Sequence, residues 1–215
     1  LASSAASDVY KRQTINNLTY SIATGGLHSQ DIPRVLISTW DGVSSFTGET
    51  VKRNNEDNNN NNFVYVHYDI SSFYPSIMAE YNIGPEHLNV NIFSKLIRWL
   101  RDTRIEAKHS KQDIIDGIPK NILAEALKIV INSIYGKLGF AYGDICDRLA
   151  VLKVTINGQL MIMMLCEELE LNGIEIVSAN TDGIVVKLFE NKVETFKAIT
   201  CLLYTSPSPR DPKTS

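Results

Sequence analysis

A strand that ends in an aspartate constrains the fold of this chain more than any other stretch. Residues 63–68, Phe-Val-Tyr-Val-His-Tyr, are rich in β-branched and aromatic side chains and therefore predict a β-strand. Alternation along a strand places Tyr65, His67 and Asp69 on one face. A Ser-Ser turn follows, and Pro75 is expected to end the regular pairing. Taken alone, Asp69 is most simply interpreted as the cap of this turn or of a following helix.

The composition is that of a globular protein with unusual ends. The chain has 215 residues, enough for one large or two small domains, with 44% hydrophobic and 21% charged residues. The longest apolar run, residues 160–166, is too short to span a bilayer. Residues 1–13 and 202–215 resemble translated adapter sequence, so we expect non-native tails on an internal fragment of a longer protein. Genuine flexible tails are the alternative.

Cysteine content and charge bear on compartment and partner. The three cysteines form no Cys-x-x-Cys pair, which favours core packing in a reducing compartment over disulfides or zinc. We therefore expect a cytoplasmic protein, in the host cytoplasm if the source is a virus. The net charge is −3 and each tail carries +1, so the body carries −5. That charge alone does not indicate a protein that binds duplex DNA.

Two segments before the aspartate strand are expected to lack regular structure. Gly25 and Gly26 predict a tight turn ahead of a strand at residues 34–40. Paired glycines often mark a close backbone approach to a ligand or another strand, although an ordinary turn is the simpler interpretation. Residues 54–62 are almost all asparagine and are expected to form a surface loop.

A basic helix is predicted at residues 91–112. The helical period gathers four apolar side chains on one face: Ile92, Leu96, Trp99 and Leu100. A row of basic side chains runs beside that face: Arg101, Arg104, Lys108 and Lys111. Residues 95–128 hold eight basic and five acidic residues, which suggests an anionic partner such as phosphate. A solvated charged face is the commoner meaning of such a run.

A second helix is predicted to begin near Lys120, after the breaks at Gly117 and Pro119. The stripe expected to be buried consists of Leu123, Leu127, Val130 and Ile134. Another face carries Lys128, Asn132 and Tyr135. Two antiparallel helices with facing cationic stripes could grip phosphate, whereas ordinary hydrogen bonding between the helices would equally explain the polar face.

The last third of the chain predicts a long helix and a hairpin. Residues 147–171 are largely apolar, and an Asn-Gly pair supplies the stop. Residues 174–179 and 184–188 then read as two strands joined by a tight turn. Asp182 lies at the tip, where an aspartate is normally only a turn residue.

In order and wording, these motifs resemble those of the family B DNA polymerases. Residues 69–76, Asp-Ile-Ser-Ser-Phe-Tyr-Pro-Ser, are similar to the first polymerase motif of that family. Residues 128–136, with Lys, Asn, Tyr and Gly at the spacing K-x-x-x-N-S-x-Y-G, are similar to the second. Residues 180–183, Asn-Thr-Asp-Gly, resemble the third, which usually reads D-T-D-S.

Two shorter patterns extend the resemblance. Arg104 and Lys108 are similar to the basic pair on the other fingers helix of the family. Gly25 and Gly26 resemble its template-binding linker motif, although Ala23 stands where that motif usually has Tyr. The resemblance covers about residues 17–190 and is closest in character to bacteriophage polymerases.

The resemblance implies an α+β fold, a polymerase palm made of an antiparallel sheet with packed helices and an inserted two-helix fingers hairpin. It places the N-terminal part of the palm at residues 14–90, the fingers helices at 91–140, and the C-terminal part of the palm, with the third-motif hairpin, at 141–201. The tails at 1–13 and 202–215 lie outside these domains.

The function implied is template-directed DNA synthesis, with nucleotidyl transfer from a dNTP to a primer 3′-OH. Two Mg²⁺ ions, with Mn²⁺ as an alternative, would be held by the catalytic Asp69 and Asp182 and by the carbonyl of Ile70. The nucleotide-binding residues implied are Ser72, Phe73, Tyr74, Arg104, Lys108, Lys128 and Asn132. The DNA-binding residues implied are Gly25, Gly26, Tyr135 and Gly136. Primer–template DNA and dNTP are the expected partners, without a membrane.

Two other functions stay open. One is a two-metal nuclease in which the same aspartates activate water. The other is a catalytically inactive palm that binds nucleic acid, which is supported by the truncation of the chain and by Asn180, where the family usually has Asp.

Overall fold

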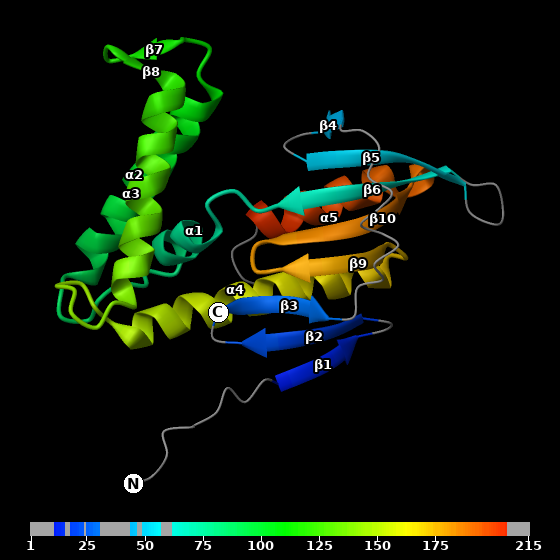
Figure 1. Cartoon of the computed structure of the whole chain (residues 1–215), viewed down its shortest axis with the longest axis horizontal. Helices are drawn as coiled ribbons and strands as arrows, with labels where there is room; N and C mark the ends of the chain where they lie inside the picture. The colour runs from blue at the N-terminus through cyan, green and yellow to red at the C-terminus, as the bar shows by residue number, and fades with distance from the viewer. Residues whose placement is uncertain are drawn as a thin grey trace, which may run out of the picture. The chain divides into compact units, whose positions relative to one another are not determined.

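The computed structural model describes residues 11–15, 18–23, 25–30, 44–46, 49–56 and 62–205. It divides into two compact units (Figure 1). Unit 1 takes the chain up to Ile70 and again from Gln159, and unit 2 is Ser71–Gly158. The strand predicted at 34–40 lies outside the described residues, as do 1–10 and 206–215.

Within the described residues, unit 1 is built on an eight-stranded sheet in which every pairing is antiparallel. The order across the sheet is β1-β2-β3-β9-β10-β6-β5-β4. The strands are β1 (Lys11–Ile15), β2 (Leu18–Ala23), β3 (Gly26–Gln30), β4 (Ser44–Phe46), β5 (Glu49–Glu56), β6 (Asn62–Asp69), β9 (Glu175–Asn180) and β10 (Gly183–Phe189). The mixed α+β class with an antiparallel sheet is thus confirmed.

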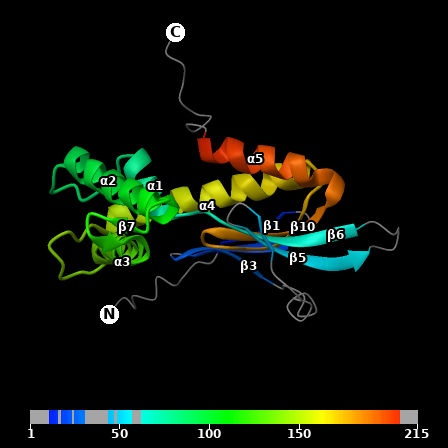
Figure 2. The ribbon, with the colours of Figure 1, turned by 90° about the horizontal axis from the view of Figure 1, so that it is seen from above.

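Strand β6 lies inside this sheet, between β5 and β10. Val66 on β6 and Val186 on β10 pair with each other and are buried. Helix α5 (Val193–Thr205), which follows the short 3₁₀ helix η2 (Glu190–Lys192), lies over one face of the sheet, as does the part of helix α4 (Arg148–Leu171) that belongs to unit 1 (Figure 2). On that face the rings of Tyr68 and Phe196 meet edge to face at 5.9 Å.

Both ends of the segment predicted as an asparagine-rich loop belong to strands. Residues 54–56 belong to β5, and β6 already begins at Asn62, while 57–61 lie outside the described residues. The backbones of the two strands pair through Asn55 with Phe63 and Glu56 with Asn62. The prediction was wrong here because backbone hydrogen bonding to a neighbouring strand does not require side chains with high strand propensity.

The predicted tails also contribute to regular structure at their inner ends. Residues 11–13 form most of β1 and pair with Ser21 and its neighbours on β2. Residues 202–205 continue α5. Residues 11–13 and 202–205 are therefore part of regular elements, whereas the non-native origin of the tails stays a prediction.

Unit 2 is helical. Its elements are α1 (Phe73–Glu80), α2 (Val90–His109), the small hairpin β7 (Ile114–Ile115) and β8 (Ile118–Pro119), α3 (Lys120–Leu138) and the beginning of α4. Helices α2 and α3 lie side by side, joined at one end by the β7–β8 hairpin (Figure 1). The three predicted long helices are all present, and Gly117, in the left-handed region at φ 81°, makes the tight turn between β7 and β8.

The buried faces of α2 and α3 differ from the predicted ones. On α2, Trp99 is 61% exposed, whereas Phe93, Ile97 and Leu100 are buried. On α3, the buried side chains are Ala124, Ile131 and Leu138. Of the predicted α2 face, Ile92 and Leu96 are exposed as well, and of the predicted α3 stripe, Val130 is exposed and the others are half-buried. Both helices carry apolar residues on more than one side, so packing decides which side faces inward.

Helix α4 is long and apolar enough, by length and composition alone, to cross a membrane. The core helix of a globular domain passes the same test. Several of its apolar side chains are buried in this fold: Ala150, Val154, Ile162, Leu165 and Leu169. Cys166 is buried beside them, and burial raises the pKa of its thiol to about 12. Core packing is thus confirmed for this cysteine, whereas Cys201 is exposed.

Candidate functional site

Two carboxylates from distant parts of the chain meet in unit 1. Asp69 is the last residue of β6, and Asp182 lies in the two-residue turn between β9 and β10. Asp69 pairs directly with Gly183, the residue after Asp182. The amide N–H of Ile70 donates a 2.8 Å hydrogen bond to the carbonyl oxygen of Asp182. Strand pairing therefore places these two candidate site residues next to each other.

The charges of these two aspartates influence each other. Partial burial, followed by the nearby charge of Asp69, raises the pKa of Asp182 above its ordinary value, while His67 acts in the opposite direction. The Nε2 atom of His67 lies 3.1 Å from Oδ1 of Asp69. A carboxylate whose ionised form is disfavoured by the negative charge of a neighbour is suited to a cation that the two share.

The two carboxylates are suitable ligands for a divalent ion, but they do not complete its coordination by themselves. Mg²⁺ prefers oxygen ligands and usually keeps several waters while binding one or two carboxylates. Among the described residues, no group of three or more His, Cys, Asp or Glu side chains is arranged to hold a metal. The two aspartates are therefore suited to an ion that shares its coordination with water or with the oxygens of a substrate.

Gly183 makes room for the first carboxylate. A Cβ atom at this position would collide with Oδ1 of Asp69. The third motif of the family usually has Ser here. In this chain the residue is Gly, and the Asp69 carboxylate occupies the space that the Ser side chain would take. Sequence reasoning did not assign a role to Gly183, because the contact depends on the register of two strands far apart in the sequence.

The first motif continues into unit 2 through a left-handed residue. Ser72 has φ 53° and precedes α1, and its side chain caps no amide of the helix. Pro75 lies inside the first turn of α1, so it does not end strand pairing as predicted, since β6 has already ended at Asp69. Asp69 is likewise not the cap of this helix. The amides of Ser72 and Phe73 lie at a helix start, where N–H groups lack helical partners.

Arg104 of α2 reaches this helix start. Its Nη1 atom donates a hydrogen bond to Oγ of Ser72. Its Nε atom is buried and has no hydrogen-bond partner among the described residues. Two predicted nucleotide-binding residues, Ser72 and Arg104, are thus in contact within unit 2, and the guanidinium group of Arg104 is bonded to the Ser72 side chain.

Tyr74 is held by a second group of residues in unit 2. Its ring centroid lies 4.7 Å from that of Tyr135 on α3. The hydroxyl of Tyr135 is 3.2 Å from Oγ1 of Thr155 on α4. Thr155 is 1% exposed. One turn further along α4, a Cβ atom at Gly158 would lie 3.1 Å from both Phe73 and Tyr74. The sequence signalled neither α4 residue, although a glycine inside an apolar helix often has a packing reason.

The remaining predicted residues of the fingers helices lie on the surface. Lys108, Lys128 and Asn132 are exposed. Lys128 forms an ion pair of 3.7 Å with Glu125, and Gly136 is exposed near the end of α3. At the opposite end of the sequence, Gly25 is exposed, whereas Gly26 is buried.

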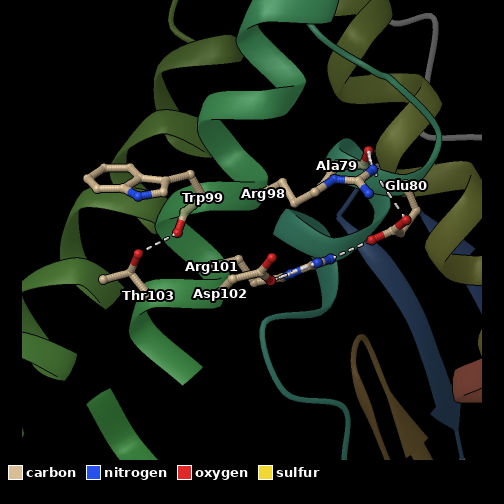
Figure 3. A network of polar contacts seen from close by, with 7 residues as sticks. All are labelled: Ala79, Glu80, Arg98, Trp99, Arg101, Asp102 and Thr103. Carbon is tan, nitrogen blue, oxygen red and sulfur yellow. Dashed lines mark hydrogen bonds and ion pairs between the residues drawn. The ribbon is translucent and has the colours of Figure 1, made fainter. Parts of the chain in front are cut away.

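The basic row of α2 is partly used within the protein. Arg101 is bonded at 2.8 Å to both Glu80 and Asp102, and its side chain is 13% exposed (Figure 3). Arg98 bonds to the carbonyl oxygen of Ala79 at 2.7 Å. These contacts join α2 to the end of α1, so Arg101 is a structural member of the predicted cationic stripe rather than a free cation.

Comparison with known proteins gives one family for most of the chain. A family model described as DNA polymerase family B matches residues 49–199. The DNA polymerase of Thermococcus sp. (strain 9oN-7) is 28% identical over 173 residues, covering 68% of this chain and 22% of its own length. The DNA polymerase alpha catalytic subunit of Xenopus laevis is 28% identical over 154 residues, covering 59% of this chain and 11% of its own length.

A solved structure also matches part of the chain. It is that of the family B DNA polymerase from the hyperthermophilic archaeon Pyrobaculum calidifontis, with a TM-score of 0.46 and 23% identity. The match covers 61% of this chain and 21% of that one. The matched part of the chain spans less than a quarter of the length of the two curated relatives described above, which are archaeal and eukaryotic.

Proposed function

The chain belongs to the family B DNA polymerases, and from this premise we propose that it is the palm and fingers part of an enzyme that extends a DNA primer on a template. The observation that carries the proposal is the pairing of β6 with β10, which brings Asp69 and Asp182 together. In this proposal the palm takes residues 14–90 and 141–201, and the fingers take 91–140. A bacteriophage source and a cytoplasmic location remain predictions from the sequence.

The two aspartates are proposed as the catalytic carboxylates. Family B polymerases use Mg²⁺, and the aspartate pair suits it because both groups are hard oxygen ligands and the charge of Asp69 disfavours the ionised form of Asp182. Two such ions, or Mn²⁺ in their place, would lower the pKa of the primer hydroxyl and offset the charge of the triphosphate. The protein's own part is to hold Asp69, Asp182 and the Ile70 carbonyl in place, which the strand pairing and the Ile70 amide support.

The helical unit is proposed to receive the nucleotide. Ser72 and Phe73 would offer backbone N–H groups to phosphate oxygens, which favour helix starts. Cations offset the charge that develops on the leaving pyrophosphate, and the proposed ones are Arg104, Lys108 and Lys128. The Nε of Arg104 is buried and has no hydrogen-bond partner in the described part of the chain, which supports a role at an anion rather than in the open solvent. Asn132 would help to position the nucleotide.

Tyr74 is proposed to exclude ribonucleotides. A ring placed under the sugar would clash with a 2′-hydroxyl, and Tyr74 is fixed by Tyr135 and Gly158, as a steric filter needs to be. Tyr135 and Gly136 would contact the base pair and template, together with Gly25 and Gly26. The DNA and the dNTP are then the partners of the site.

Primer extension tests this function. In the longer polymerase that carries these residues, Asp69→Asn and Asp182→Asn should each lower extension by at least about a hundredfold, since each loss removes several kcal/mol of metal-mediated stabilisation. Asp116→Asn, in the exposed turn between β7 and β8, is the matched control and should extend primers normally. Near-normal extension by either site variant would refute the assignment. Cleavage of DNA without pyrophosphate release would instead indicate a nuclease.

A further inference from the structure

Gly26 lies against the turn that carries Asp182. Its φ is 147°, and a Cβ atom added to it would lie 2.8 Å from Oγ1 and 3.1 Å from Cγ2 of Thr181. Gly26 is buried, whereas its neighbour Gly25 is exposed and a Cβ there would meet nothing within 4 Å. The two adjacent glycines therefore have different surroundings, although the sequence motif treats them alike.

Thr181 needs external support for its conformation. It is the first of two residues in the turn, and its φ of 35° is uncommon for a β-branched residue. Such a conformation is strained and persists where neighbouring structure imposes it. Its amide N–H donates a 2.7 Å hydrogen bond to the carbonyl oxygen of Leu27, the residue after Gly26.

The start of β3 holds the residues around this turn one after another. Oγ of Ser29 accepts a 3.0 Å hydrogen bond from the amide of Ala179. His28 pairs with Asn180 in the sheet, where β3 and β9 are neighbours (Figure 1). Asp182 follows directly, and the Ile70 amide binds its carbonyl oxygen from the other side. The peptide that carries the second carboxylate is thus fixed by β3 on one side and by the end of β6 on the other.

We propose that Gly26 is a positioning residue for Asp182, and that its missing side chain lets Thr181 seat the turn against β3. This inference rests on the proposed function and changes one part of it, because the buried Gly26 acts on the metal-binding aspartate instead of contacting DNA. Gly25 keeps its proposed role in a DNA contact.

Variants of the glycine pair test the inference in the longer polymerase. Gly26→Ala should lower kcat by about tenfold or more and raise the Mg²⁺ concentration for half-maximal activity, because small displacements of catalytic groups are costly. Its Kd for primer–template DNA should stay within about twofold of wild type. Gly25→Ala is the matched comparison and should leave the Mg²⁺ concentration for half-maximal activity unchanged, whatever it does to DNA binding.

A rescue and a milder variant guard against simple misfolding. Adding Thr181→Gly to Gly26→Ala removes the side chain that the new Cβ would strike. The double variant should therefore need a lower Mg²⁺ concentration for half-maximal activity than Gly26→Ala alone. Ser29→Ala removes the acceptor for the Ala179 amide without adding atoms, and it should raise the half-maximal Mg²⁺ concentration by about threefold. Failure of the rescue together with an unchanged Ser29→Ala would overturn the inference.

Two measurements separate this inference from the proposed function. Calorimetric titration of the protein with Mn²⁺ alone should show weaker Mn²⁺ binding in Gly26→Ala than in Gly25→Ala. This result does not depend on whether the protein extends primers. If both alanine variants instead raise the Kd for DNA while the Mn²⁺ affinity holds, the glycine pair contacts DNA and the inference fails, although the polymerase function stands. An inactive wild type would refute the function, and the Mn²⁺ titration would still decide the inference.

Discussion

The amide of Ile70 is bonded to the carbonyl oxygen of Asp182, so the residue after one carboxylate holds the residue that carries the other. This bond joins backbone to backbone, and the neighbouring pair of Asp69 with Gly183 does the same. Neither depends on the aspartate side chains. Removing a carboxylate should therefore leave the frame of the site intact, and changes in activity can be interpreted as changes in charge.

The raised pKa of Asp182 predicts a stability effect that depends on pH. The folded state binds this proton more tightly than the unfolded state, so the stabilisation is fully present at low pH and is lost as the pH rises through the folded-state pKa. Asp182→Asn should therefore be more stable than wild type at neutral pH without metal, with the difference shrinking towards acid pH. Urea unfolding of both proteins across this range measures it.

Mg²⁺ should narrow or reverse the stability difference between wild type and Asp182→Asn at neutral pH. A ligand that binds only the folded state stabilises it, and the Asn variant lacks half of the carboxylate pair. Unfolding curves recorded with and without Mg²⁺ test this directly. Equal stabilisation of both proteins by Mg²⁺ would mean that Asp182 is not a ligand.

Asn180 is predicted to be compatible with activity. Its Oδ1 atom accepts a hydrogen bond of 3.2 Å from Oγ1 of Thr181, so the amide provides an acceptor without adding a third negative charge to the site. Asn180→Asp should change primer extension by no more than roughly tenfold, about 1.4 kcal/mol in the barrier. Extension assays at several Mg²⁺ concentrations check this. An inactive parent restored by the Asp would show instead that the chain comes from a decayed polymerase.

Sugar discrimination should depend on Tyr74 and on the helix behind it. Tyr74→Ala should raise the use of ribonucleotides relative to deoxyribonucleotides, because the steric block is removed. Gly158→Ala should alter the same ratio by about threefold or more, since its Cβ would press on the Tyr74 ring at 3.1 Å. Single-nucleotide incorporation measures both. The effect of Gly158→Ala should disappear when Tyr74 is already Ala, and its persistence there would point to a different cause.

Two basic residues of the fingers helices should give opposite results. Lys128→Ala should raise the KM for dNTP by about tenfold or more, as expected from the loss of a charge-assisted contact to phosphate, with little change in stability. Arg101→Ala should lower the free energy of unfolding by about 1–2 kcal/mol. This loss is smaller than that expected for a fully buried ion pair, because the side chain of Glu80 is half exposed to solvent. Urea unfolding and steady-state kinetics separate the two. A stable Arg101→Ala with a raised KM would make Arg101 a nucleotide contact.

The sequence predicted the elements of the site better than their packing. Strand β6 and the β9–β10 hairpin follow from local signals, namely alternation and a tight turn, and both are present. The inward faces of α2 and α3 could not be predicted, because Trp99 and Ile97 are both apolar and only the neighbouring helices decide between them. The contacts of Gly26, Gly158 and Gly183 were equally hidden, since each joins residues that the sequence keeps apart.

The order of the strands also has a consequence for how the protein is made. Strands β6 and β10 are neighbours in the sheet, yet the whole of unit 2 lies between them in the chain. A ribosome therefore releases the helices of unit 2 before β10 exists, and those helices pack through nearby contacts that form quickly. Until β10 arrives, β6 presents an unpaired edge, which is where a nascent chain is most exposed to wrong partners. The two aspartates can meet only after β10 has emerged.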